Sequence, residues 1–284
     1  MDTLKKTVDK LCSASIEHYV NPFTYLQWPE SRDPDAWYMP QELLSLHPTK
    51  QFIGLSEHDQ RALSFFETVN FFSLNIHGEK HLIAELAKRL YNAEHHQTTD
   101  YLQHFLDEEN KHMTYFGGFC NRFAGKIYPS RKVEFPREYQ PGEEDFLFFA
   151  KVLIFEEIVD VYNRRAGKDK RIAEIARNIN WIHHLEESRH LAFGRELVAK
   201  LFNDYADAWG VPKQMELQEY LTGYLRATWR EYYNPDVYVD VNLDQPFELA
   251  TTAWAAGDSH RQEVSAKLLR YFDRLGLSIA EGLQ

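Results

Sequence analysis

Hydrophobic side chains recur at helical spacing through most of the chain. In four long stretches without proline they fall at positions i, i+3 and i+4, which is typical of amphipathic helices that pack their apolar faces together. Two further helical segments follow Gly210-Val211-Pro212, and a shorter, weakly amphipathic segment lies near the start. The expected helices span residues 4–20, 56–91, 98–124, 143–165, 168–205, 213–233 and 246–275.

Two segments depart from this helical pattern. Residues 22–48 contain five prolines and many aromatic residues, so we expect an irregular arm that packs onto the helices. The alternation in Val237-Tyr238-Val239-Asp240-Val241 is the one candidate β-strand. The pattern predicts an all-α fold in a single domain, residues 1–284, with an arm (1–55), a four-helix core (56–206) and a C-terminal helical extension (207–284).

Composition and charge narrow the possible partners and the compartment. With 32 Lys and Arg against 43 Asp and Glu, the formal net charge is −11, which argues against nucleic acid or an anionic membrane as a partner. No apolar run approaches the length needed to cross a bilayer, and the N-terminal residues lack the apolar core of a signal peptide. The two cysteines, Cys12 and Cys120, do not make a disulfide framework. We therefore expect a cytoplasmic protein.

Each of the four core helices carries a glutamate in the middle of its apolar stripe. A carboxylate is buried in a core only when it is paired or binds a cation. Two of these glutamates are followed three residues later by a histidine, which places both side chains on one helix face. The glutamates are Glu79, Glu109, Glu156 and Glu187, and the histidines that follow Glu109 and Glu187 are His112 and His190.

This set of side chains is typical of a dinuclear metal site. Glutamates from two helices, with Glu-x-x-His from two others, form the ligand set of ferritin-like di-iron and di-manganese proteins. Four carboxylates balance the charge of two divalent ions, and carboxylate with imidazole suits iron or manganese. His183 lies four residues before Glu187 on the same face, and we predict it as a third imidazole ligand. We therefore expect a ferritin-like core with two iron ions; manganese or a mixed manganese–iron pair is the alternative.

Two neighbouring acids compete with the predicted ligands. Glu157 is a rival of Glu156, because the helix face that carries Glu157 is also apolar. Glu108 shares a face with Lys111 and is expected to be solvated.

Other polar residues are expected to lie outside the ligand set. Glu67 is expected beside the site or on the surface, and Glu186 is one position off the ligand face. Asp160 is a candidate to hold the outer N–H of a ligating histidine. Histidines without an acid at ligand spacing are expected to be structural or exposed, namely His18, His77, His81, His95 and His96.

The arrangement of these residues resembles the p-aminobenzoate N-oxygenase family, which includes arylamine oxygenases of antibiotic biosynthesis. The family pattern is a Glu, a long gap, Asp-Glu-x-x-His, a later Glu, and then His-x-x-x-Glu-x-x-His. The resemblance covers about residues 56–201 and implies a di-iron site of four glutamates and three histidines. The matching residues are Glu79, Glu109, His112, Glu156, His183, Glu187 and His190. One position differs, because Glu108 stands where the family has aspartate.

The resemblance implies an enzyme that activates O2 through a peroxo intermediate and oxygenates the nitrogen of a small aromatic or amine substrate in a biosynthetic pathway. The sequence contains no G-x-G-x-x-G motif and no cysteine cluster, so we expect an external electron donor or reductase. A homodimer is the candidate assembly. Phenylalanines near the ligands are expected to form a dry pocket, namely Phe72, Phe105, Phe116, Phe149 and Phe193.

Two other functions use the same predicted site. The first is hydroxylation or desaturation at carbon, including on a carrier-bound substrate, because fold and ligands do not determine the substrate. The second is iron storage or ferroxidase activity without an organic substrate. Storage proteins of this fold are usually shorter, so we rank this function last.

Overall fold

The structure is a computed structural model that describes residues 3–131 and 137–284. It is all-α, as predicted, and no β-strand occurs in these residues. A bridge between Trp37 and Ile172 is the isolated β-type contact found there. The backbone N–H of Ala173 also donates to the carbonyl of Trp37 (2.7 Å). The chain is therefore not helical just before residue 174, and the helix expected from residue 168 begins later than predicted.

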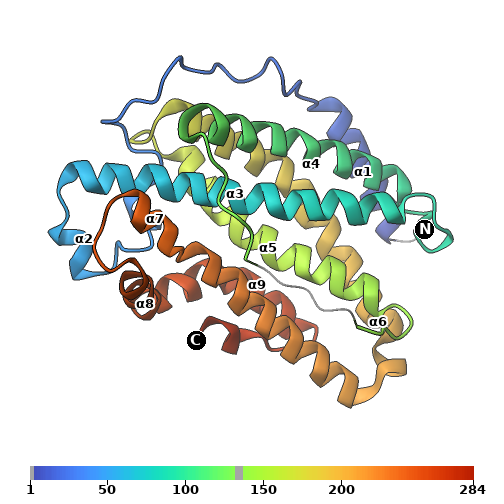
Figure 1. The fold of residues 1–284 in the computed structure, drawn as a ribbon. Helices are drawn as coiled ribbons and strands as arrows, with labels where there is room; N and C mark the ends of the chain where they lie inside the picture. Colours follow the sequence, from blue (N-terminus) through green and yellow to red (C-terminus); the bar gives the residue numbers. More distant parts are fainter. Residues whose placement is uncertain (1–2, 132–136) are drawn as a thin grey trace. The chain divides into compact units, whose positions relative to one another are not determined.

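Helices make up most of the described chain (Figure 1). None of them is long and apolar enough to cross a membrane. The architecture is that of the ferritin-like bundle predicted from the sequence. The helices are α1 (Thr3–Glu17), α2 (Lys50–Gly54), α3 (Glu57–Arg89), α4 (Thr99–Phe119), α5 (Glu143–Lys168), α6 (Glu174–Tyr232), α7 (Pro235–Asp240), α8 (Pro246–Ala256) and α9 (Asp258–Arg274).

Two compact units divide the chain. The first unit comprises Met1–Leu44, Leu55–Ser130 and Tyr162–Phe193. The second unit comprises Ser45–Gly54, Arg131–Val161 and Gly194–Gln284. Helices α5 and α6 each contribute residues to both units. The predicted single-domain organisation stays a prediction.

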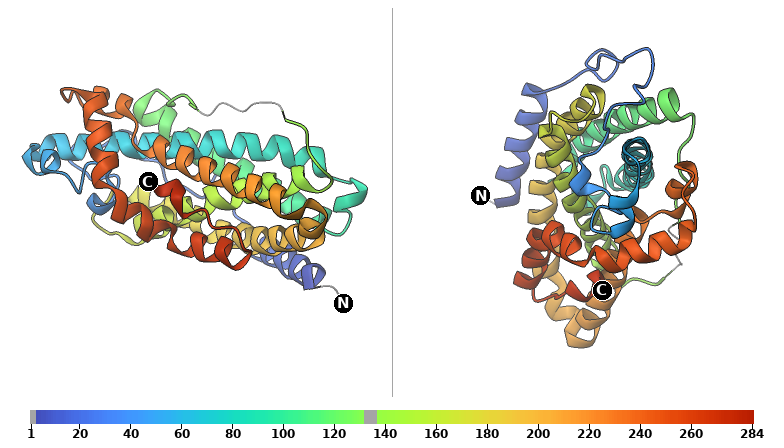
Figure 2. Two further views of the ribbon diagram at one scale, coloured as in Figure 1. Left: turned by 90° about the horizontal axis from the view of Figure 1, so that it is seen from below. Right: turned by 90° about the vertical axis from the view of Figure 1, so that its left-hand side faces the viewer.

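In the first unit, α3 and α4 form a long helical hairpin. Ser56 caps α3, since its Oγ accepts a hydrogen bond from the backbone N–H of Asp59 (3.1 Å). Figure 2 shows α3 as one unbroken helix. After a short connection α4 returns along α3 and packs against it, while α1 packs on α4. This hairpin holds the middles of α3 and α4 together, where the predicted ligands lie.

The N-terminal arm packs onto the helices of the first unit through some of its aromatic residues. Tyr38 is buried, and its ring packs edge-on against Phe65 and Phe119 at centroid distances of 5.2 and 5.9 Å. The ring of Trp28 lies so close to Gly118 that a Cβ there would come within 2.9 Å of it. Phe23, by contrast, is 80% exposed. The predicted packing of the arm is therefore confirmed for only part of it.

In the second unit, two glycines interrupt the C-terminal helices. Gly210 has φ 69° and ψ 170°, a conformation that only glycine adopts readily, so the predicted break before Pro212 is confirmed. The single helix predicted over residues 246–275 is wrong, because the chain is divided into α8 and α9 at Gly257. A side chain at Gly257 would collide with the hydroxyl of Tyr233. Close packing at this position therefore requires a glycine.

The predicted strand at residues 237–241 is wrong as well. Residues Pro235–Asp240 form the short helix α7. The side chain of Asn234 caps this helix by accepting from the backbone N–H of Asp236 (3.0 Å), and a proline occupies its first turn. The helix buries Val237 and Tyr238 and exposes Val239. In so short a segment, the capping residues decide the structure and the alternation does not.

Candidate metal centre

Six of the seven predicted ligands lie in the first unit, on three helices. Helical spacing brings the residues of each helix onto one face. Every one of these side chains is at most 2% exposed, although all six are titratable. They are Glu79 from α3, Glu109 and His112 from α4, and His183, Glu187 and His190 from α6.

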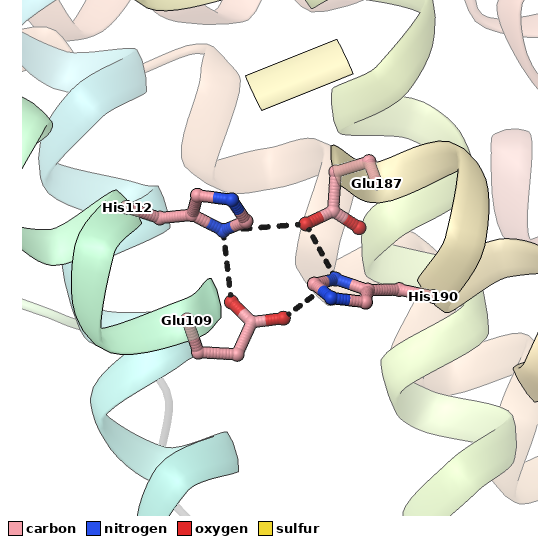
Figure 3. A group of neighbouring side chains, drawn as sticks. All are labelled: Glu109, His112, Glu187 and His190. Atoms are coloured by element: carbon pink, nitrogen blue, oxygen red, sulfur yellow. Dashed lines mark hydrogen bonds and ion pairs between the residues drawn. The ribbon is translucent and has the colours of Figure 1, made fainter. Parts of the chain in front are cut away.

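Four of these side chains form a ring of alternating carboxylates and imidazoles (Figure 3). The Nδ1 of His112 lies 3.2 Å from Oε2 of Glu109 and 3.4 Å from Oε1 of Glu187. The Nδ1 of His190 lies 2.9 Å from Oε1 of Glu109 and 3.0 Å from Oε1 of Glu187. One ligand atom from each residue falls within 4.8 Å of the others, which is close enough for all four to hold one ion.

A second group of ligands overlaps the first at His112. The Nε2 of His183 lies 3.3 Å from Oε1 of Glu79 and 3.3 Å from Oε1 of Glu187. The same oxygen of Glu79 lies 3.8 Å from Nδ1 of His112. Glu79, His112 and His183 together satisfy the same spacing criterion for a metal ion. Two neighbouring groups of ligands are compatible with a pair of ions, of which Nδ1 of His112 can bind one.

The electrostatics of the cluster favour a cation. Burial, reinforced by the nearby charges of Glu109 and Glu187, raises the pKa of Glu79 well above its usual value, although His112 opposes this. Burial also acts to raise the pKa of Glu187, but the adjacent His190 and His183 hold it well below its usual value. These buried carboxylates therefore depend on nearby positive charge.

Unused polar atoms also show that the residues fit a metal. Both carboxylate oxygens of Glu79, one oxygen each of Glu109 and Glu187, and Nε2 of His183 are buried without a hydrogen bond. Unsatisfied buried polar atoms are costly. Metal ions bind the lone pairs of such carboxylate oxygens, and that of an imidazole nitrogen once its proton has moved to the other ring nitrogen. Carboxylate oxygens with imidazole nitrogens suit iron or manganese.

The outer nitrogens of two imidazoles are held by glutamates that directly precede the ligands. Nε2 of His190 contacts Glu108 (2.8 Å), and Nε2 of His112 contacts Glu186 (3.1 Å). Because an ionised carboxylate only accepts, each Nε2 carries the proton and each Nδ1 faces the cluster. The prediction that Glu108 is solvated is wrong, since its side chain is 2% exposed.

These contacts are reciprocal between two similar five-residue motifs. Residues 108–112 read Glu-Glu-Asn-Lys-His, and residues 186–190 read Glu-Glu-Ser-Arg-His. Arg189 donates to Glu108 (2.6 Å), and Lys111 donates to Glu186 (2.7 Å). The first glutamate of each motif thus contacts both the basic residue (Lys or Arg) and the histidine of the other motif. Although burial opposes them, His190 and Arg189 lower the pKa of Glu108 to about 2.

The imidazole of His183 has a different outer partner. Its Nδ1 contacts the side-chain amide of Asn163, which is fully buried near the end of α5. Asp160 belongs to the second unit, so its predicted role at the outer nitrogen of a ligating histidine stays a prediction. The sequence reasoning missed Asn163, because a lone polar residue on an apolar helix carries no spacing signal.

The seventh predicted ligand, Glu156, belongs to the second unit. Glu156 and its rival Glu157 are both buried on α5, at 2% and 4% exposure. Within that unit Glu157 accepts from Nε of Arg195 (2.6 Å) and lies 3.7 Å from Nζ of Lys267. Two cations therefore balance the charge of Glu157, which favours Glu156 as the ligand. The membership of Glu156 in the ligand set stays a prediction.

Other residues weighed in the sequence fall around the centre or away from it. Glu67 is buried on α3, so it does not lie on the surface. His77 binds the carbonyl of Tyr128 (2.7 Å), which is the structural role expected. His95 is buried, whereas His18, His81 and His96 are exposed.

Aromatic rings pack directly against the ligating imidazoles. Phe105 stacks on His190 with ring centroids 3.9 Å apart, and Phe116 packs edge-on against His183 at 4.9 Å. These rings keep water from the imidazoles on one side. Of the five phenylalanines expected near the ligands, Phe72, Phe105, Phe116 and Phe193 are buried in the first unit and Phe149 in the second.

Comparison with known proteins gives the family. A search of curated proteins returned no match. The family model "P-aminobenzoate N-oxygenase AurF" matches residues 2–276. This range extends well beyond residues 56–201, so the N-terminal arm and most of the C-terminal helices belong to the family pattern as well. The chain therefore belongs to the p-aminobenzoate N-oxygenase family, whose members are di-iron N-oxygenases and hence oxidoreductases.

Proposed function

We propose that this chain binds two iron ions and uses O2 to oxygenate the nitrogen of an arylamine. The observation that carries the proposal is the pair of overlapping ligand groups that share His112 within a buried cluster. In balanced form the first step is R–NH2 + O2 + 2 e⁻ + 2 H⁺ → R–NHOH + H2O. The proposed ligands are Glu79, Glu109, His112, Glu156, His183, Glu187 and His190.

The side chains of the cluster divide the work of holding the ions. Glu109 and Glu187 each lie near both His112 and His190, so they are suited to serve either ion. Glu79 and His183 extend the group to one side. When bound, the iron pair supplies the electrons that reduce O2. Manganese or a mixed pair accepts the same ligands.

The outer contacts hold the ligating imidazoles in a fixed orientation. Glu108 and Glu186 fix the tautomers of His190 and His112, and Arg189 and Lys111 neutralise those two glutamates. Phe105 and Phe116 shield the imidazoles from water, which suits a planar, largely apolar substrate. These features support an aromatic amine as the substrate.

Electrons must reach this site from outside the chain. The sequence has no flavin or nicotinamide fingerprint and no cysteine cluster, so we propose a separate reductase as the donor. The oxygen-bound intermediate, the biosynthetic pathway, the cytoplasmic location and the homodimer expected from the sequence remain predictions.

The decisive experiment is a single turnover with counted iron. The full chain is loaded anaerobically with Fe(II), the bound iron is counted, and ¹⁸O2 is added with p-aminobenzoate as the probe amine. We expect two irons per chain and an ¹⁸O-labelled hydroxylamine, nitroso or nitro product by mass spectrometry. Label on a ring carbon would favour the carbon hydroxylase, and oxidised iron without any organic product would favour a ferroxidase.

Variants of adjacent histidines provide a matched control. His183→Ala removes a proposed ligand, and we expect it to keep the fold but change the reaction with O2. His184→Ala changes the next residue, which packs against Trp181 at a centroid distance of 5.3 Å. That variant should behave like the parent. Equal behaviour of both variants would remove His183 from the ligand set.

A further inference from the structure

The outer partner of each imidazole determines which ring nitrogen is free to bind a metal. Glu186 and Glu108 can only accept, so His112 and His190 keep their protons on Nε2. His183 is reversed, because its outer nitrogen is Nδ1 and its inner nitrogen is Nε2. Its partner is a neutral amide that can both donate and accept.

The amide of Asn163 faces Nδ1 of His183, so its orientation depends on which ring nitrogen of His183 carries the proton. In the structure the Nδ2 of Asn163 faces Nδ1 of His183, so the amide donates and the ring proton lies on Nε2. That Nε2 faces Glu79 and Glu187 at 3.3 Å each. The other amide atom, Oδ1 of Asn163, is buried without a hydrogen bond.

Metal binding through Nε2 of His183 requires the opposite tautomer, with the proton on Nδ1. A half-turn of the Asn163 amide brings Oδ1 to that N–H and gives Oδ1 the hydrogen bond it lacks. A carboxylate at this position could serve only the Nδ1–H tautomer, and an apolar residue could serve neither. Asparagine is therefore a partner for both.

We propose that Asn163 is the positioning residue of His183, and that its amide turns over when a metal binds Nε2. The proposal rests on the proposed metal site. It makes His183 chemically distinct from the other two imidazoles, because a neutral partner strengthens a metal-bound imidazole less than a carboxylate does. His183 is thus the least firmly held of the three imidazoles.

Zinc is a suitable probe because it is diamagnetic and accepts the same ligands. The full chain carries ¹⁵N-labelled histidine, and two-bond ¹H–¹⁵N spectra at mildly alkaline pH report which ring nitrogen of each histidine bears the proton. Without zinc we expect Nε2–H on His183, and with zinc Nδ1–H. His112 and His190 should keep Nε2–H in both spectra.

Two substitutions at residue 163 sharpen the test. In Asn163→Asp the carboxylate only accepts, so His183 should show Nδ1–H with and without zinc while zinc affinity is retained. In Asn163→Leu the partner is lost, and affinity for one zinc should fall by about 10–100-fold. Asn180→Leu is the control, because Asn180 is equally buried on α6 but donates to the backbone carbonyl of Ala176 (2.7 Å). It should leave the tautomer of His183 unchanged.

The possible failures can be told apart. If Asn163→Leu binds zinc as tightly as the parent chain and its His183 still becomes Nδ1–H, the role of Asn163 is overturned and the ligand set stands. If zinc shifts His112 and His190 but not His183, then His183 is not a ligand and the proposed site itself fails. If Asn163→Leu does not fold, Asn163→Asp alone decides between a fixed and a switching tautomer.

Discussion

Two regions of the molecule bury charge in opposite ways. In the ligand cluster of the first unit, acids and imidazoles crowd together and several of their polar atoms make no hydrogen bond. In the C-terminal helices of the second unit, Arg261 is just as buried, at 2% exposure, but its donors are used. A buried charge whose hydrogen bonds are all made within the protein stabilises the fold, whereas buried charges with unused polar atoms indicate a binding site for a ligand.

The partners of Arg261 come from neighbouring segments of the second unit. Its Nε donates to the carbonyl of Leu283 (2.9 Å), and its Nη1 donates to the carbonyl of Trp254 (2.7 Å). Its guanidinium also lies 3.8 Å from the centroid of the Trp254 ring, which Arg230 approaches at 3.6 Å. This arrangement is complete without any further group, whereas the ligand cluster is not.

The largest effect is expected at Arg261. Arg261→Leu leaves the carbonyls of Trp254 and Leu283 without their donor, so the free energy of unfolding should fall by about 3 kcal/mol. Urea unfolding of the metal-free protein measures it. Arg270→Leu, an exposed position on α9, is the control and should change stability by less than about 0.5 kcal/mol. Similar losses in both variants would contradict the structural role of Arg261.

Glu79→Gln should change the free energy of unfolding in the opposite direction, towards greater stability. Because burial raises the pKa of Glu79 above its unfolded value, the ionised carboxylate costs stability at neutral pH, and the cost falls as the pH falls. The glutamine variant should therefore stabilise the metal-free protein by about 1–2 kcal/mol and abolish the stabilisation by zinc. Thermal unfolding with and without zinc measures both effects. Glu57→Gln, at an exposed site on α3, is the control, and a destabilised metal-free Glu79→Gln protein would refute the comparison.

A smaller effect, on zinc affinity, is expected for Glu186, which contacts a ligating histidine from outside the cluster. Glu186→Gln keeps an acceptor for His112 but removes the charge that strengthens this imidazole as a ligand. Zinc affinity, measured by competition with a chelator, should fall about tenfold. Glu196→Gln, exposed on the same helix, should leave the affinity unchanged. Unchanged affinity in Glu186→Gln would mean that the reciprocal contacts have no influence on the metal.

The smallest effect on stability is expected for an ion pair whose two side chains are exposed to solvent. Glu42 and Arg171 form a two-armed ion pair (3.0 and 2.8 Å), but both side chains are more than half exposed. Glu42→Gln should lower the free energy of unfolding by less than about 0.5 kcal/mol. A loss above about 1 kcal/mol in urea unfolding would show that exposure is a poor guide to the cost of charge in this protein.

The sequence predicts the long helices and the ligands for the same physical reason. Helical periodicity over many turns is a strong signal, and an acid inside an apolar stripe stands out against it. Glu79, Glu109 and Glu187 were found in this way. The short helix α7 was missed because its six residues hold too little periodicity to outweigh an apparent alternation.

The supporting residues of the site were harder to predict. Glu108 and Lys111 lie one turn apart and look like a solvated pair, but their partners are on another helix. A single helix face cannot reveal such a cross-helix contact. The repeated Glu-Glu-x-Lys/Arg-His motif was the available signal for Glu186 and Arg189, whereas Asn163 left none.

The crossed contacts between the two motifs have a mechanical consequence. Each histidine is oriented by a glutamate from the helix that carries the other histidine. A small separation of α4 from α6 therefore releases both imidazoles together. The two contacts are therefore coupled, and a substitution that separates the helices at one contact should weaken the other as well.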